Sequence, residues 1–278
     1  MAVTEGQLSK MSAVLSKDGT ASYQMPVGKH RVDMAALMGK QLSFEFAGEI
    51  CCQHCQRPTK KSFSGGFCYP CSQKLAQCDL CFMKPEICHF EQGTCREPDW
   101  GQAVCMQPHV VYLANSSGPK VGITRTGQIP TRWIDQGATQ ALPIFMVQSR
   151  HQSGLVETIF KQHVSDRTDW RKMLKAPAAP IDLAELRDRL FAETSHEIAA
   201  LQQRYAEQSI QALKAERVIE ISYPVLQYPD KVTSLSFDKT AQLAGELLGI
   251  KGQYLILDTG VLNIRKFTGY HVTLEFAA

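Results

Sequence analysis

Ten cysteines restrict what this chain can fold into, because all of them fall between residues 51 and 105. Four of them form two Cys-x2-Cys pairs with 12 residues between the pairs, Cys52-x2-Cys55 and Cys68-x2-Cys71. Within each pair the short turn lets two thiolates converge on one ion, and two pairs complete a tetrahedral shell. We therefore predict a structural zinc ion at these four residues.

The next four cysteines predict a second zinc ion. Cys78-x2-Cys81 is followed by Cys88 and Cys95, each with six residues between it and its predecessor, and His89 is an alternative ligand. Thiolate sets of this size also hold iron–sulfur clusters, so zinc and iron–sulfur are both open at either set. A closed shell of four ligands has no position for a substrate, which makes both sites structural. In such a module, metal binding takes the place of an apolar core.

Composition and charge indicate an ordinary globular protein rather than a membrane or secreted one. Hydrophobic residues make up 44% and charged residues 21%, as in ordinary soluble domains, and no apolar run approaches the ~18 residues of a membrane span. The first residues lack the features of a secretory signal, so we expect a cytoplasmic, bacterial protein without a membrane partner. The formal net charge is only +3, but residues 106–175 carry nine basic and four acidic side chains, a local excess of +5. That excess favours an anionic ligand, and a solvated basic face is the alternative.

The pattern after the cysteines predicts a compact α/β module. Residues 110–113 and 120–123 read as the strands of a hairpin, 128–136 as a short helix and 142–148 as a third strand. Residues 153–164 have helical apolar spacing, with Ser153 as the expected N-cap. The predicted order is therefore hairpin, helix, strand, helix.

Residues on these elements resemble the GIY-YIG nuclease superfamily. Val110-Val111-Tyr112 stands at the first motif and Lys120-Val121-Gly122 at the second, with Arg132 on the first helix and Glu157 on the next. The resemblance covers roughly residues 108–175. The whole layout is also similar to a bacterial family of uncharacterised function that combines four-cysteine zinc ribbons with a GIY-YIG nuclease-like module.

The resemblance implies a phosphodiester-cleaving site that uses Mg²⁺ or Mn²⁺. Glu157 would bind the metal, and Arg132 would bind the phosphate through two hydrogen bonds. Tyr112 would orient or deprotonate the attacking water, and the nearby Lys120 would lower the pKa of the Tyr112 phenol. His163 is given only a supporting role. The residues expected to contact DNA or RNA are Lys120, Arg125, Arg132, Arg171 and Lys172.

Simpler interpretations exist for the same residues. Tyr112 can be a half-buried strand aromatic, and Glu157 can pair with Lys161 four residues later. The glycine and isoleucine of the first motif are both valine here, and Lys120 replaces the second tyrosine. These departures leave open a module that binds nucleic acid without cutting it, or a zinc-scaffolded protein-interaction module.

The two ends of the chain are rich in strand patterns, and we expect them to pair in one sheet or barrel. Asp182 and Glu185 predict the capped start of one long amphipathic helix or two. The expected fold class is α+β: a zinc-ribbon module and a GIY-YIG-like β-hairpin/α/β/α module, flanked by β-rich termini. The expected segments are a β-rich segment (1–50), a two-zinc module (51–105), the nuclease-like module (106–178), a helical segment (179–217) and a β-rich segment (218–278).

Overall fold

Strands from both ends of the chain build one antiparallel sheet in the computed structural model, which describes residues 2–277. The sheet has the order β1-β14-β5-β11-β12-β13. Val3 lies opposite Glu275, and Phe44 of β5 lies opposite Leu274 of β14. The strands are β1 (Ala2–Gln7), β5 (Gln41–Ile50), β11 (Gln242–Lys251), β12 (Tyr254–Leu257), β13 (Gly260–Asn263) and β14 (Tyr270–Phe276).

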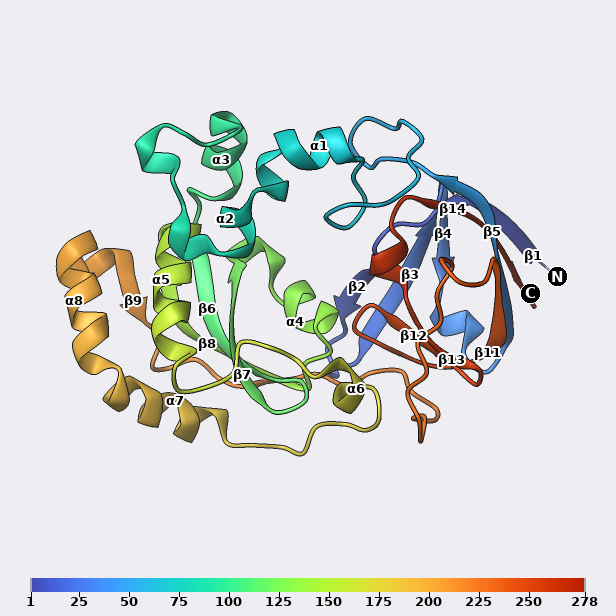
Figure 1. The fold of residues 1–278 in the computed structure, drawn as a ribbon. Coiled ribbons are helices and arrows are strands. Elements are labelled where there is room, and N and C mark those ends of the chain that lie inside the picture. The colour runs from blue at the N-terminus through green and yellow to red at the C-terminus, as the bar shows by residue number, and fades with distance from the viewer. Residues whose placement is uncertain (1, 278) are drawn as a thin grey trace.

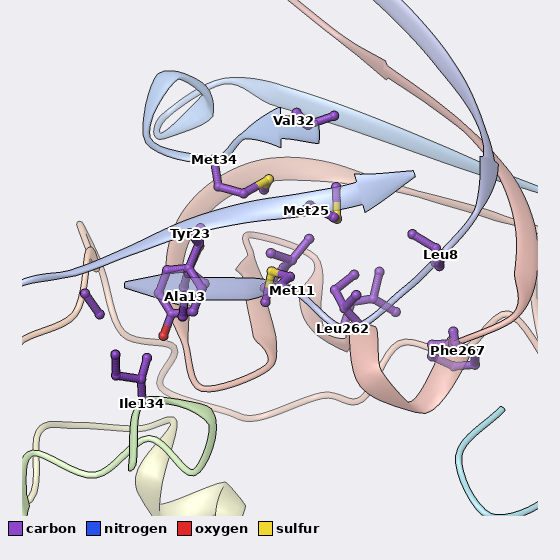
Figure 2. Close-up of a cluster of buried hydrophobic side chains, with 14 of the residues drawn as sticks. Leu8, Met11, Ala13, Tyr23, Met25, Val32, Met34, Ile134, Leu262 and Phe267 are labelled. Atoms are coloured by element: carbon purple, nitrogen blue, oxygen red, sulfur yellow. The ribbon is translucent and has the colours of Figure 1, made fainter. Parts of the chain in front are cut away.

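A smaller sheet packs on this one and closes the main core. It has the order β2-β3-β4, with strands β2 (Ser12–Leu15), β3 (Ala21–Val27) and β4 (His30–Asp33). Alternate residues of β3 point inward, as expected for a half-buried strand. Figure 2 shows the resulting core, in which Met11, Tyr23 and Met25 meet Leu262 from the other end of the chain and Ile134 from the central module.

The central module is built on a second antiparallel sheet with the order β10-β8-β6-β7, and β9 pairs with β8. Its strands are β6 (His109–Asn115), β7 (Pro119–Arg125), β8 (Gln140–Val147), β9 (Ile210–Ala212) and β10 (Ile219–Glu220). Every residue of β6 is buried, because strands flank it and helices cover both faces. β7 lies at the edge of the sheet and pairs with a strand, β6, on one side only.

Different helices cover the two faces of this sheet, α5 on one face and α4 on the other (Figure 1). Val156 and Phe160 of α5 share a core with Val111 and Val121, whereas Trp133 of α4 packs against Tyr112 on the other face. The helices of this half are α4 (Thr131–Asp135), α5 (Arg150–Phe160), α6 (Trp170–Met173), α7 (Leu183–Glu193) and α8 (Ser195–Tyr205).

Caps fix where these helices begin. The Ser149 hydroxyl accepts a hydrogen bond from the Gln152 N–H, so α5 begins at Arg150 and the expected N-cap at Ser153 is wrong by one turn. Asp182 caps α7 as expected, accepting from the N–H groups of Ala184 and Glu185. The helical segment is two helices, with Thr194 between them.

The cysteine-rich segment contains only short helices, α1 (Tyr69–Lys74), α2 (Leu80–Met83) and α3 (Pro98–Val104), joined by single turns. It docks on α5, where Gly154 lies so close to Pro85 that a Cβ on this glycine would fall 2.6 Å from the proline side chain. Lys161 adds an ion pair to Glu86 at 3.6 Å. The fold is therefore α+β, with the cysteine-rich segment held against the central module.

Candidate functional site

The first cysteine group is assembled as the spacing predicts. The four sulfur atoms of Cys52, Cys55, Cys68 and Cys71 lie within 4.8 Å of one another, and those of Cys55 and Cys68 are 3.7 Å apart. A tetrahedral zinc ion with Zn–S bonds of ~2.3 Å places its sulfurs about 3.8 Å apart. The group can therefore hold zinc.

Local structure prepares the Cys52 thiol for a metal. Burial opposes ionisation of Cys52, but hydrogen bonds from the backbone N–H groups of Cys55, Cys68 and His54 lower the pKa of its thiol to about 6. Cys68 stands at the N-cap of α1, and Cys71 follows in its first turn. Gln56, directly after the Cys52-x2-Cys55 pair, has a φ of 58° in the left-handed region.

The second predicted set is not assembled in the same way. Among the described residues, Cys78, Cys81, Cys88 and Cys95 do not form a group with sulfurs within 4.8 Å of one another. Cys81, Cys88 and Cys95 line one small cavity, and Cys78 is not among the residues that line it. The Cys-x2-Cys spacing predicts Cys78 and Cys81 on one ion, but Cys78 ends a single 3-10 turn (Ala76–Cys78) whereas Cys81 belongs to α2, and the two are not brought into one ligand group.

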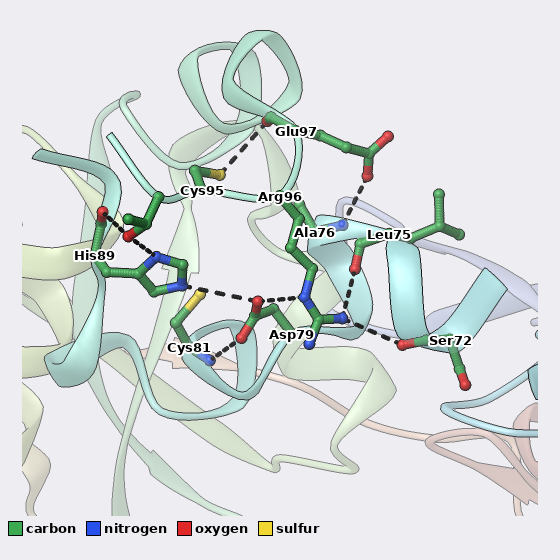
Figure 3. Close-up of polar contacts among 10 residues, drawn as sticks. Ser72, Leu75, Ala76, Asp79, Cys81, His89, Cys95, Arg96 and Glu97 are labelled. Carbon is green, nitrogen blue, oxygen red and sulfur yellow. Dashed lines mark hydrogen bonds and ion pairs between the residues drawn. The ribbon is translucent and has the colours of Figure 1, made fainter. Parts of the chain in front are cut away.

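His89, the alternative ligand, lies near Cys81 and Asp79 (Figure 3). These groups are already engaged with other residues. The Asp79 carboxylate accepts from Arg96 Nε at 2.6 Å and caps the Cys81 N–H, and His89 Nδ1 is 2.7 Å from the Thr94 hydroxyl. This polar cluster ties α2 to the loop before α3.

The hairpin β6–β7 buries Tyr112 completely. Its hydroxyl donates to Gln136 Oε1 at 2.8 Å, and its ring packs edge-on against Trp133 with centroids 5.9 Å apart. Gly122 lies directly opposite Tyr112 in the register, and a Cβ on this glycine would fall 2.7 Å from the Tyr112 hydroxyl oxygen. The glycine in the second strand is therefore required by the tyrosine of the first.

This close approach gives a stability prediction. Gly122→Ala is expected to destabilise the protein by about 1 to 2 kcal/mol, because the buried tyrosine has to move or lose its hydrogen bond to Gln136. Gly127→Ala is the matched control, since nothing lies within 4 Å of a Cβ at that position. Denaturant unfolding of both variants measures the difference, and equal stabilities would contradict this role for Gly122.

A cleft of about 440 Å³ runs along the edge strand β7. Every residue from Lys120 to Arg125 lines it, and six basic and three acidic side chains surround it. Arg132 reaches it from α4 on one side of the sheet, and Glu157 reaches it from α5 on the other. Lys120, Arg125, Arg132 and Glu157 of the predicted set therefore share one cleft.

Glu157 is the carboxylate of this cleft. Burial, and then the negative charge of Asp166, raise the pKa of Glu157 to about 7. Lys161, which the sequence offers as its partner, pairs with Glu86 instead. Within residues 2–277, no hydrogen bond or ion pair to the Glu157 carboxylate is present, so this group is open to a cation.

Lys120 is the buried cation of the cleft, with a side chain only 3% exposed. Burial and the neighbouring charge of Arg132 lower the pKa of Lys120 to about 8. A lysine held in this way is poised to gain an anionic partner, because a phosphate would offset both the desolvation and the repulsion.

The expectation that Lys120 lowers the pKa of Tyr112 is wrong. Burial raises the pKa of Tyr112 to about 12, although Arg132 opposes the rise. Lys120 lies opposite Ala114 rather than opposite Tyr112. Tyr112 is therefore a neutral phenol that supports the wall of the cleft from behind Gly122.

Three predicted residues lie elsewhere. Arg171 and Lys172 belong to α6 and line a separate hollow with Lys175 and Lys231. His163 is an exposed residue whose Nδ1 is 3.1 Å from a carboxylate oxygen of Glu193 on α7, so it takes no part in the cleft.

The structure adds charged residues to the cleft that are not among the predicted site residues, namely Lys10, Asp135, Arg150, Asp166 and Arg265. Lys10 and Arg265 come from opposite ends of the chain and reach the cleft through the pairing of the termini. The local excess of basic residues around 106–175 was a signal for Arg150, but it did not single this residue out.

Comparison with known proteins assigns the chain to a family. Residues 39–272 match the family described as "Protein of unknown function (DUF2797)", and since the match spans most of the chain, the chain belongs to this family. Neither a curated protein nor a solved structure matches it. No helix in the part of the chain that the structure describes has the length and apolar character needed to cross a membrane.

Proposed function

We propose that the cleft along β7 binds a phosphodiester of DNA or RNA and that the protein is an endonuclease of GIY-YIG type that depends on Mg²⁺ or Mn²⁺. One observation carries the proposal: Lys120, Arg132 and Glu157, which belong to three different elements, line the same cleft. Two cations can offset charge on a phosphate, and an unpaired carboxylate can hold a divalent metal that activates water for phosphodiester hydrolysis.

Each residue has a separate part in this proposal. The guanidinium of Arg132 offers two parallel N–H donors to phosphate oxygens, and Lys120 adds a point charge beside them. Glu157 would hold the divalent cation, and its raised pKa means that cation binding drives loss of its proton. The bound cation would supply a water of lowered pKa and offset charge on the phosphoryl oxygens. The hydrogen bond from Tyr112 holds Gln136, which also lines the cleft.

A second candidate function is nucleic-acid binding without cleavage. The burial of Tyr112 favours it, because a phenol with a pKa of about 12 that already donates to Gln136 is not available to activate water. In this alternative the basic side chains of the cleft bind the phosphate, and the zinc-binding segment and β-rich ends position the strand.

Incubation of the full chain with Mg²⁺ or Mn²⁺ and a panel of single-stranded, duplex and branched DNA and RNA tests the proposal. We expect cleavage that falls at least about 100-fold in Glu157→Gln, because this change removes the proposed metal ligand and keeps the shape of the side chain. Glu197→Gln, an exposed change on α8, is the matched control and should cut like the unmodified chain.

Binding without cleavage under either metal would overturn the nuclease and support the second function. The absence of both cleavage and salt-dependent binding would overturn both and favour a zinc-scaffolded protein-interaction module.

A further inference from the structure

Four cysteines surround a second cavity, and they are not the four that the spacing predicts. A small cavity of about 20 Å³ is lined by Cys81, Cys88, Cys95 and Cys105. Cys105, which belongs to neither of the predicted sets, takes the place of Cys78. We propose that these four cysteines hold an iron–sulfur cluster.

The separation of the sulfur atoms distinguishes this set from the first. The four thiols of Cys52, Cys55, Cys68 and Cys71 are close enough for one tetrahedral ion, whereas no three of the second set, all of them described residues, lie within 4.8 Å of one another. In a four-iron cluster each thiolate binds a different iron at a corner of the cube, so the sulfurs stand farther apart than around one zinc ion.

The walls of the cavity fit such a cluster. Phe82, Phe90 and Trp100 shield it from water, and Gly101 allows the closest approach, since a Cβ on this glycine would fall 3.1 Å from Cys95 Sγ. His89 also lines the cavity, but its Nδ1 is 2.7 Å from the Thr94 hydroxyl and its Nε2 is 3.7 Å from an Asp79 carboxylate oxygen, so both ring nitrogens have partners and the four thiols are the ligands that remain.

Arg150 offsets the negative charge that four thiolates bring. Its backbone N–H donates to the Cys105 carbonyl at 2.7 Å, and its guanidinium lies over the Phe82 ring and donates to the Phe82 carbonyl at 2.6 Å. Arg150 also lines the cleft along β7. The cluster would therefore order one wall of that cleft without contacting a substrate.

The test is the metal content of the full chain purified without oxygen, and again after incubation with ferrous iron and sulfide. We expect about four irons and four acid-labile sulfides per chain, a broad visible absorption band, and zinc at the first group only. Cys105→Ser and, separately, Cys88→Ala should lose nearly all of the iron. Cys78→Ser and Cys51→Ser are the matched controls and should keep it.

Zinc content at the first group and far-UV circular dichroism report whether each variant is folded. If the unmodified chain takes up two zinc ions and no iron after incubation, the cluster is contradicted. Loss of iron in Cys78→Ser but not in Cys105→Ser would overturn the ligand set.

Discussion

Cys68→Ser is expected to remove the zinc ion from the first group and to unfold the segment around residues 52–71. This segment has few buried apolar side chains, so metal ligation supplies most of its folding free energy, of the order of 10 kcal/mol for zinc sites of this kind. The six-stranded sheet and the central module have apolar cores of their own and should remain folded.

Hydrogen exchange and zinc analysis of the full chain measure this effect. Amides of the segment should exchange rapidly in Cys68→Ser, while those of β5 and β6 should stay protected. Cys51→Ser is the matched control, because Cys51 lies outside the four-cysteine group and its thiol has a hydrogen bond with Glu49. Protection of the segment without bound metal would show that zinc is not what folds it.

Glu157→Gln is expected to stabilise the metal-free protein by about 2 kcal/mol at about pH 8. The pKa of Glu157 is raised from 4.5 to about 7, so between these values the folded state binds more protons than the unfolded state. Stability conferred by the protonated carboxyl is therefore complete below 4.5 and is lost as the pH rises through about 7. The full shift corresponds to about 3 kcal/mol, and partial exposure to solvent reduces it.

Thermal or denaturant unfolding at several pH values tests whether Glu157→Gln is stabilising and at which pH. The difference between Glu157→Gln and the unmodified chain should vanish near pH 4, where both side chains are neutral. Mg²⁺ at about pH 8 should stabilise the unmodified chain and not the variant, by mass action on the folded state. Glu197→Gln should show neither effect, and a destabilised Glu157→Gln at pH 8 would contradict an uncompensated carboxylate in the cleft.

Local patterns predicted the parts of the fold that depend on neighbours in sequence. The strand pattern of the hairpin, the capping residue Asp182 and the first four-cysteine group all follow from short-range periodicity and spacing. Ser149 was missed as the N-cap of α5 because Ser153, one turn later, has the same residue type.

Contacts between distant segments were harder to predict. The place of Cys105 in the second cavity depends on a contact between the end of α3 and the start of α5, where the Arg150 N–H donates to the Cys105 carbonyl. Lys10 and Arg265 reach the cleft because strands from the two ends pair. Burial of Tyr112 also depends on Trp133 from another element, so the direction of the pKa shift of Tyr112 could not be inferred from the presence of Lys120 on the neighbouring strand.

The most direct test of a nucleic-acid site at this cleft is the salt dependence of binding to a short nucleic acid in the absence of divalent metal. The unmodified chain should lose affinity steeply between about 50 and 200 mM salt, and Lys120→Met with Arg132→Met should weaken binding and lower the logarithmic slope by about 2. Lys17→Met with Arg31→Met, two exposed cations outside the cleft, is the matched control and should leave both quantities unchanged. An unchanged affinity and slope in the cleft variant would contradict the site.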